Sequence, residues 1–276
     1  MKLSKLKIQL AKSFKQKKID SNEVNILICE ALGVKFEDLF KIESLTSNQV
    51  KKIKYYANQR LSGKPIQKIF KRAYFFDFVF YVNNNVLCPR PETELLVEEV
   101  LKNIKPNKSI LDLCIGSGCI AITVSKKSNA NVFASDISQK ALYVAKKNAK
   151  NIGADVKFIK SNMFENIHQK FDIIVSNPPY ISTADCQNLD TEVKNYDPII
   201  SLDGGSDGLD FYRIISQRAK YFLNENGKIL LEVGQNQAKK VAKLLQNDFI
   251  VTIKKDYNHI ERIVIGELKW LKDVTK

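Results

Sequence analysis

Apolar residues recur along this chain with two different periods, and the change from one to the other divides the sequence. Over residues 3–60 they recur at helical spacing with lysines between them, beginning with Leu3, Leu6, Leu10 and Phe14. This spacing places apolar side chains on one face of a helix. Ser62-Gly63-Lys64-Pro65 then interrupts the pattern, as a loop does. We therefore expect a small helical domain of three to five helices over residues 1–62.

Residues 63–87 have a different character and predict a linker that contains a β-hairpin. The run Tyr74–Val82 is aromatic and β-branched, which favours short strands, and Asn83-Asn84-Asn85 is typical of a turn. We expect the aromatic side chains to pack in a core or an interface. Platforms that stack nucleic-acid bases instead space their aromatic residues along a basic groove.

Strand and helix patterns alternate over residues 88–276. The apolar runs predict strands near 109–114, 131–135, 156–160, 171–176, 228–233, 248–253 and 261–266. Helical patterns lie near 92–103, 118–128, 138–151, 208–222 and 235–246. Alternation of this kind predicts a mostly parallel sheet covered on both faces, an α/β fold of seven strands. The turn at 254–258 is too short for a helical crossover, so the sheet should end in an antiparallel hairpin.

Composition limits the classes of partner and cellular compartment but does not identify a reaction. The 276 residues include 44 Lys and Arg against 30 Asp and Glu, a formal charge of +14. This balance favours an acidic or nucleic-acid partner, or belongs to a solvated surface. The five cysteines form no CxxC pair, so we expect reduced thiols in the cytoplasm. With only two histidines we expect no metal site, and we expect neither a signal peptide nor a membrane span.

The segment Ser109–Cys119 predicts a strand that runs into a ligand-binding turn. Gly116 and Gly118 permit close approach of a ligand, and the helix after Gly118 would point backbone donors at it. The segment is not the dinucleotide fingerprint, because no glycine lies three residues after Gly118. We expect Asp112 to face this loop, where a carboxylate suits a cationic group such as a sulfonium.

A second acid, Asp136, ends the next predicted strand. An acid at that strand end can accept both ribose hydroxyls of a nucleoside. Alternatively, Asp136 caps the helix that starts near Ser138. The Gly-rich turn, this acid and Asn177-Pro178-Pro179-Tyr180, in that order and each after a strand, together indicate S-adenosylmethionine as the cofactor.

Asn177-Pro178-Pro179-Tyr180 follows a third strand, where chemistry usually occurs in an open α/β sheet. Two consecutive prolines hold the chain stiffly and supply no backbone donors. The Asn177 side-chain oxygen and the Pro178 carbonyl remain as acceptors, and Tyr180 adds an aromatic face or packs within the loop. Two rigid acceptors beside a ring suit a planar –NH2 group, so the tetrapeptide predicts transfer to an amide or an exocyclic base amine.

The order of these motifs resembles the class I methyltransferases, and more closely the PrmC/HemK family of release factor glutamine methyltransferases. Asn-Pro-Pro-Tyr alone is shared with adenine and guanine amino-methyltransferases, whereas the Pro-Arg-Pro-Glu-Thr-Glu and Asp-Gly-Gly stretches are more specific. The resemblance covers most of residues 62–266 and is carried by the stretches Pro89–Glu98, Gly116–Ala121, Ser176–Ile181, Leu202–Tyr212 and Leu231–Gly234.

The resemblance implies a Rossmann-like fold, S-adenosylmethionine as methyl donor and a set of site residues. The catalytic residues would be Asn177, Pro178 and Tyr180, with Pro179 completing the substrate pocket. The cofactor would contact Asp112, Cys114, Ile115, Gly116, Ser117, Gly118, Asp136, Asn162, Met163 and Asn177. Two positions depart from the family pattern: Cys114 stands where the loop usually opens with glycine, and Asn162 stands where aspartate is common.

Three functions stay open at this point. The resemblance implies a monomer that methylates the glutamine of the Gly-Gly-Gln motif in class 1 peptide chain release factors. The charge instead favours an N6-adenine or N2-guanine methyltransferase on DNA or rRNA, although residues 1–60 carry no recognised nucleic-acid motif. A module that binds RNA without turnover is the third, and the intact site motifs argue against it.

Overall fold

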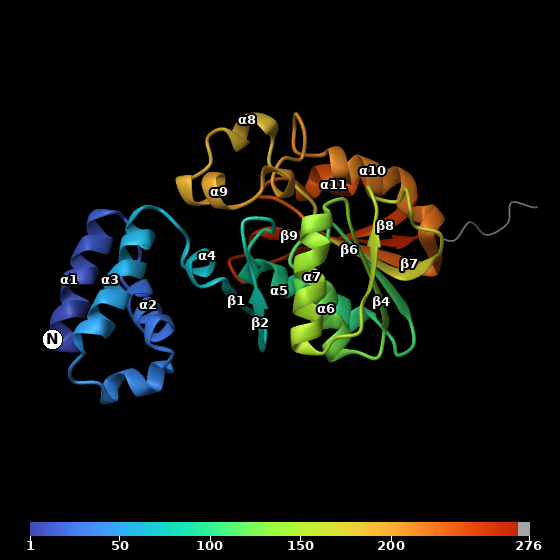
Figure 1. Ribbon diagram of the computed structural model, residues 1–276. Helices are drawn as coiled ribbons and strands as arrows, with labels where there is room; N and C mark the ends of the chain where they lie inside the picture. Colours follow the sequence, from blue (N-terminus) through green and yellow to red (C-terminus); the bar gives the residue numbers. More distant parts are fainter. Residues whose placement is uncertain (270–276) are drawn as a thin grey trace, which may run out of the picture. The chain divides into compact units, whose positions relative to one another are not determined.

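The computed structural model describes residues 1–269 and divides the chain into two compact units, Met1–Lys71 and Arg72–Lys276 (Figure 1). The division falls inside the segment expected to be a linker. The short helix α4 (Ile66–Phe70) belongs to the first unit, and the hairpin that follows belongs to the second.

The first unit is helical, as its spacing predicts. Its elements are α1 (Leu3–Gln16), α2 (Glu23–Leu32), η1 (Phe36–Lys41), α3 (Ser47–Leu61) and α4. The apolar stripe of α1 is buried in a core shared with α2 and α3. Thr46 begins α3 with a capping box, in which its side chain and that of Gln49 each accept the other's backbone N–H. Arg60, also buried, donates to Glu23 at 2.5 and 3.0 Å and so joins α3 to α2.

The aromatic run forms the expected hairpin, but its turn lies elsewhere. Strand β1 (Arg72–Phe75) pairs antiparallel with β2 (Phe78–Tyr81), so the chain reverses at Phe76-Asp77, with Phe76 at a φ of 49°. Asn83–Asn85 does form a turn, but it follows the hairpin. Phe75 and Phe80 are buried in the core of the second unit, as expected for packing aromatics.

The second unit is built on a seven-stranded sheet of order β5-β4-β3-β6-β7-β9-β8. The first five strands in this order are parallel, and β9 is antiparallel to both of its neighbours. The predicted C-terminal hairpin is therefore confirmed. The strands are β3 (Ser109–Leu113), β4 (Asn131–Asp136), β5 (Lys157–Lys160), β6 (Phe171–Ser176), β7 (Leu223–Glu232), β8 (Phe249–Lys255) and β9 (Glu261–Leu268).

Helices cover both faces of this sheet and give it two cores. One core joins the sheet to α5 (Pro91–Asn103), α6 (Cys119–Lys127) and α7 (Gln139–Ile152). The other joins the opposite face to α10 (Asp210–Arg218) and α11 (Ala238–Leu245). Within β3, Ile110 packs in the first core and Leu111 in the second, because successive side chains of a strand point to opposite faces. Among residues 1–269, the structure contains no helix that could span a membrane.

The connection between β6 and α10 differs from its predicted form. It contains three short helices that the periodicity did not indicate: α8 (Thr183–Cys186), α9 (Thr191–Tyr196) and η2 (Ile199–Ser201). The helix expected over 208–222 is divided into α10 and the 3₁₀ turn η3 (Ala219–Phe222). Elements of three to six residues bury too few apolar positions to show a period.

Candidate active site

A pocket opens at the carboxyl ends of β3, β4 and β6, where ligands bind in open α/β sheets. It encloses about 940 Å³ of empty space with its open mouth included, enough for a nucleoside-sized cofactor and part of a second molecule. The predicted residues that line it are Cys114, Ile115, Gly116, Ser117, Asp136, Asn162, Met163, Asn177 and Pro179. Asp112, Gly118, Pro178 and Tyr180 are not among its lining residues.

Asp136 joins the Gly-rich loop to the start of α7. One carboxylate oxygen accepts the Gly116 N–H at 3.0 Å and the other accepts the Ser138 N–H at 2.8 Å. Ser138, not Asp136, is the helix cap, since its hydroxyl accepts the Ala141 N–H. Burial raises the pKa of Asp136, and the backbone N–H groups oppose that shift. Each oxygen keeps an acceptor site, so the carboxylate can hold two ribose hydroxyls.

The two glycines of the loop have different roles. Gly116 has a φ of 54° and open space where a Cβ would lie, so it leaves room beside the pocket. A Cβ on Gly118 would lie 2.7 Å from Ile122 Cδ1 and 3.2 Å from Ala145 Cβ, between α6 and α7. Gly118 therefore allows the two helices to pack; it does not line the pocket, and its contact with the cofactor stays a prediction.

Asp112 is buried and does not line the pocket. It lies on the same side of β3 as Ile110, toward α6, and its carboxylate accepts the Ala121 N–H at 3.1 Å. Burial raises its pKa well above the usual value. Strand alternation turns the Asp112 side chain to the helix-covered face, and its contact with the cofactor stays a prediction. Its position supports a role in anchoring α6.

The pocket lining also contains both departures from the family pattern. Cys114 has a φ of 61°, a conformation that glycine adopts without strain, and its sulfur lies 3.9 Å from that of Met163. Burial raises the pKa of the Cys114 thiol, so the group behaves as an apolar wall. The Asn162 amide donates to Glu165 at 2.8 Å, which leaves its oxygen as the free acceptor.

Asn177 is held in one orientation by α5. Its Nδ2 donates to Thr93 Oγ1 at 3.2 Å, so Oδ1 remains as an acceptor at the pocket. Ser176, just before it, donates to the Leu113 carbonyl at 2.7 Å and fixes the strand end. Thr93 is buried and lies 84 residues from Asn177 in the sequence, within the Pro-Arg-Pro-Glu-Thr-Glu stretch. The sequence marked that stretch as specific but gave no role to the threonine.

A buried carboxyl group that the sequence reading missed lies beside this pair. Glu232 ends β7, and burial raises its pKa to about 7. The neighbouring Thr93 and Asn177 side chains oppose the shift through hydrogen bonding, as does the charge of Arg262, whereas the charge of Glu92 reinforces it. Only the motif Leu231-Glu232-Val233-Gly234 pointed to this position.

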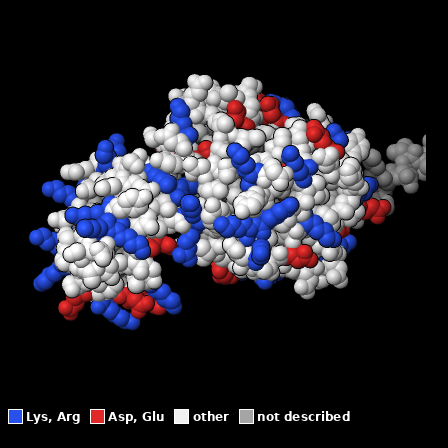
Figure 2. Space-filling model, viewed as in Figure 1, with Lys and Arg blue, Asp and Glu red and all other residues white. Residues whose placement is uncertain are grey.

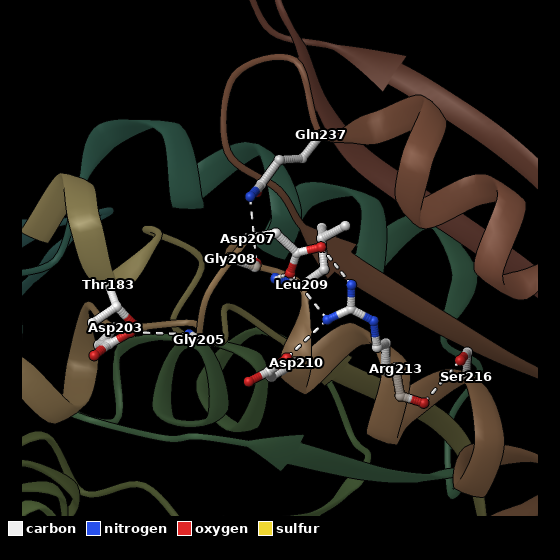
Figure 3. A network of polar contacts seen from close by, with 10 residues as sticks. All are labelled: Thr183, Asp203, Gly205, Asp207, Gly208, Leu209, Asp210, Arg213, Ser216 and Gln237. Atoms are coloured by element: carbon white, nitrogen blue, oxygen red, sulfur yellow. Dashed lines mark hydrogen bonds and ion pairs between the residues drawn. The ribbon is translucent and has the colours of Figure 1, made fainter.

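The Asn-Pro-Pro-Tyr segment rests on a loop that contains the Asp-Gly-Gly stretch. Gly204 N donates to the Ile181 carbonyl at 2.8 Å, and Ile181 N donates to the Leu202 carbonyl at 2.9 Å. A network of polar contacts holds this loop, in which Arg213 reaches both Asp207 and Asp210 and Asp203 accepts from Thr183 (Figure 3). The loop thus supports the substrate side of the site, a role that the sequence left undecided between channel edge and plain connection.

The fold and the pocket together define a methyltransferase of the Rossmann-like class I type, with S-adenosylmethionine as its cofactor. Asp136 and the Gly116 turn can hold the nucleoside, and the side chain of Asn177 is fixed at the same strand ends. Residues 90–195 match the model of a family described as "Methyltransferase small domain". A methyltransferase from Pyrococcus furiosus has the same fold, with a TM-score of 0.56 and 18% identity, over 76% of this chain and 96% of that one.

Relatives in sequence specify the family. The chain is 39% identical to the release factor glutamine methyltransferase of Thermodesulfovibrio yellowstonii over 88% of this chain and 91% of the relative. It is 43% identical to the protein of the same name from Flavobacterium psychrophilum over 73% and 74% of the two chains. The chain therefore belongs to the release factor glutamine methyltransferase family.

Proposed function

We propose that this enzyme methylates the side-chain amide nitrogen of the glutamine in the Gly-Gly-Gln motif of class 1 peptide chain release factors, with S-adenosylmethionine as methyl donor. The observation that carries the proposal is the orientation of Asn177. Because its Nδ2 donates to Thr93, its Oδ1 is available beside the pocket to accept one N–H of a substrate amide. The Pro178 carbonyl is the second acceptor.

These two acceptors act on an amide nitrogen, which is a poor nucleophile because its lone pair is delocalised into the carbonyl. Holding both N–H bonds orients the nitrogen and favours its change toward tetrahedral geometry. When bound, the cofactor supplies an electrophilic methyl group on its sulfonium. The nitrogen loses a proton after it has gained the methyl group, so the residues need only align and polarise. Pro178 and Pro179 keep the acceptors rigid.

The charge of the helical unit supports a macromolecular partner. Met1–Lys71 contains 16 Lys and Arg against 6 Asp and Glu, so it carries most of the net charge of the chain. Figure 2 shows blue Lys and Arg side chains spread over much of the visible face of this unit. We propose that the unit docks the release factor, that the enzyme works as a monomer, and that it acts in the cytoplasm. The same charge is the observation that favours the second candidate, an N6-adenine or N2-guanine methyltransferase.

Labelled cofactor separates the candidates. The protein is incubated with methyl-labelled S-adenosylmethionine and a release factor, a release factor whose motif glutamine is replaced by alanine, rRNA, or DNA. We expect label in the intact release factor alone, and peptide mass analysis should place it on the motif glutamine. Label that appears in nucleic acid and not in the release factor would overturn the proposal.

A further inference from the structure

The Gln237 side chain joins three backbone segments with one amide group. Its Oε1 accepts the Gly234 N–H at 3.0 Å, at the end of β7. Its Nε2 donates to the Tyr180 carbonyl at 2.8 Å and to the Gly208 carbonyl at 3.3 Å. Figure 3 shows the amide pointing at Gly208 from the segment before α11. Gln237 is half-buried and does not line the cofactor pocket.

The loop beneath Tyr180 fits only as glycine at two positions. A Cβ on Gly208 would lie 2.3 Å from the Tyr180 carbonyl oxygen, and one on Gly204 would lie 2.7 Å from the Pro179 carbonyl oxygen. Gly208 also has a φ of 74°, which disfavours other residues. The two backbones are thus in direct contact, and the Tyr180 carbonyl stays open to the Gln237 amide.

The ring of Tyr180 is fixed from the same direction. A Cβ on Gly234 would lie 2.9 Å from Tyr180 Cδ2, so the ring of Tyr180 packs against the Gly234 backbone. The Oε1 bond of Gln237 holds this Gly234 backbone in place. The Gln237 side chain therefore fixes the position of the Tyr180 carbonyl and of the backbone against which the Tyr180 ring packs.

We propose that Gln237 is a positioning residue that aligns the Asn177 and Pro178 acceptors by fixing Tyr180. Two prolines, whose φ angles are restricted, separate Tyr180 from Asn177, so a fixed Tyr180 limits where Asn177 can lie. The other end of the segment is held by Thr93 and by the Ser176 hydroxyl. The inference rests on the proposed function, because the acceptors matter only if a planar amine is the substrate.

Three variants of the full chain test the inference. Gln237→Glu keeps an acceptor for the Gly234 N–H but places a carboxylate oxygen against the Tyr180 and Gly208 carbonyls. Gln237→Ala removes all three bonds. Gln246→Ala is the matched control, since Gln246 ends the same helix with an exposed side chain. Release factor methylation gives kcat and KM, titration calorimetry gives the S-adenosylmethionine Kd, and hydrogen exchange follows the backbone amides around Tyr180.

For Gln237→Glu we expect kcat to fall about 10- to 100-fold, the loss expected of displaced catalytic groups. The Kd of S-adenosylmethionine should stay within about twofold of the parent, since Gln237 does not line the cofactor pocket, and we expect the same of the KM of the release factor. Gln237→Ala should lose less, because it adds no repulsion. Exchange in the peptide that covers residues 176–184 should accelerate in both variants, and Gln246→Ala should match the parent.

An unchanged kcat in Gln237→Glu would overturn the inference, and so would a loss of cofactor affinity that parallels the loss of kcat. In both cases, methylation by the parent protein would leave the proposed function intact. A parent that methylates no release factor would overturn the proposed function. Hydrogen exchange still decides the inference in that case, since unaltered exchange around Tyr180 in both Gln237 variants would show that Gln237 does not position this segment.

Discussion

The two halves of the site are assembled in different ways. The cofactor half is formed by consecutive strand ends and short turns, in which Asp136 binds the backbone of Gly116 and Ser138. The substrate half combines a tetrapeptide with supports from α5, from the 203–208 loop and from Gln237, which lie up to 84 residues from it in sequence. The first half joins segments that are close in sequence, with Gly116 and Asp136 20 residues apart, whereas the second joins segments that lie far apart in the chain.

The largest expected effect belongs to the substrate half. Asn177→Ala removes one acceptor of the amide and should lower kcat by about 10²- to 10³-fold, as loss of one preorganised catalytic hydrogen bond does. The Kd of S-adenosylmethionine should change by less than about fivefold, since most of the pocket is untouched. Steady-state methylation of a release factor and calorimetry measure the two quantities. Near-normal turnover would show that Asn177 is not a required acceptor of the substrate amide.

Glu232, which lies in the substrate half, should make the free energy of unfolding depend on pH. The folded pKa of about 7 lies above the ordinary value of 4.5, so between these values only the folded state keeps the proton. The free energy of unfolding should therefore fall as pH rises across this window, by about 3 kcal/mol from this group alone. Glu232→Gln should flatten the slope and be more stable than the parent at pH 8. Urea unfolding at several pH values measures the slope, and equal slopes in the two proteins would refute the prediction.

The cofactor half should respond in affinity rather than in turnover. Asp136→Ala removes a carboxylate expected to hold the ribose hydroxyls, and we expect the Kd of S-adenosylmethionine to rise about 10- to 100-fold, the loss of one or two hydrogen bonds to a charged group. At saturating cofactor, kcat should approach that of the parent. If kcat at saturation fell as far as in Asn177→Ala, the two halves would not be separable in this way.

The smallest effect distinguishes the two glycines. Gly118→Ala introduces a Cβ against Ile122 and Ala145 at a φ of 86°, and should lower the free energy of unfolding by about 1–3 kcal/mol with little change in cofactor Kd. A Cβ on Gly116 would meet only the Cys114 carbonyl oxygen, at 4.0 Å, so Gly116→Ala should destabilise less, despite the φ of 54°, but weaken cofactor binding. Thermal unfolding with and without S-adenosylmethionine compares the two variants. The reverse pattern would indicate that Gly118, and not Gly116, lies against the ligand.

Much of the fold was predictable because period and length are local properties of a sequence. All seven strands of the large sheet overlap the apolar runs that predicted them, and β6 matches residue for residue, although β7 begins five residues before its predicted start. The hairpin of β1 and β2 was predicted, but its turn was not, since Asp77 is the only turn-forming residue there and the reversal occurs within an aromatic run. The three short helices after Tyr180 were missed because they bury almost no apolar positions: α9 and η2 have no buried residue, and α8 has only Cys186.

By itself the sequence determined the two-unit order, the strand ends and the motifs that follow them, because motif chemistry and hydrophobic period need only neighbours along the chain. Only the tertiary structure decided which way each side chain faces and what supports it. Strand alternation turned Asp112 toward α6, and the close packing of α6 and α7 leaves no room for a side chain at Gly118. The placement of Thr93, Glu232 and Gln237 around Asn177 and Tyr180 depends on contacts between distant segments, and no local pattern encodes such contacts.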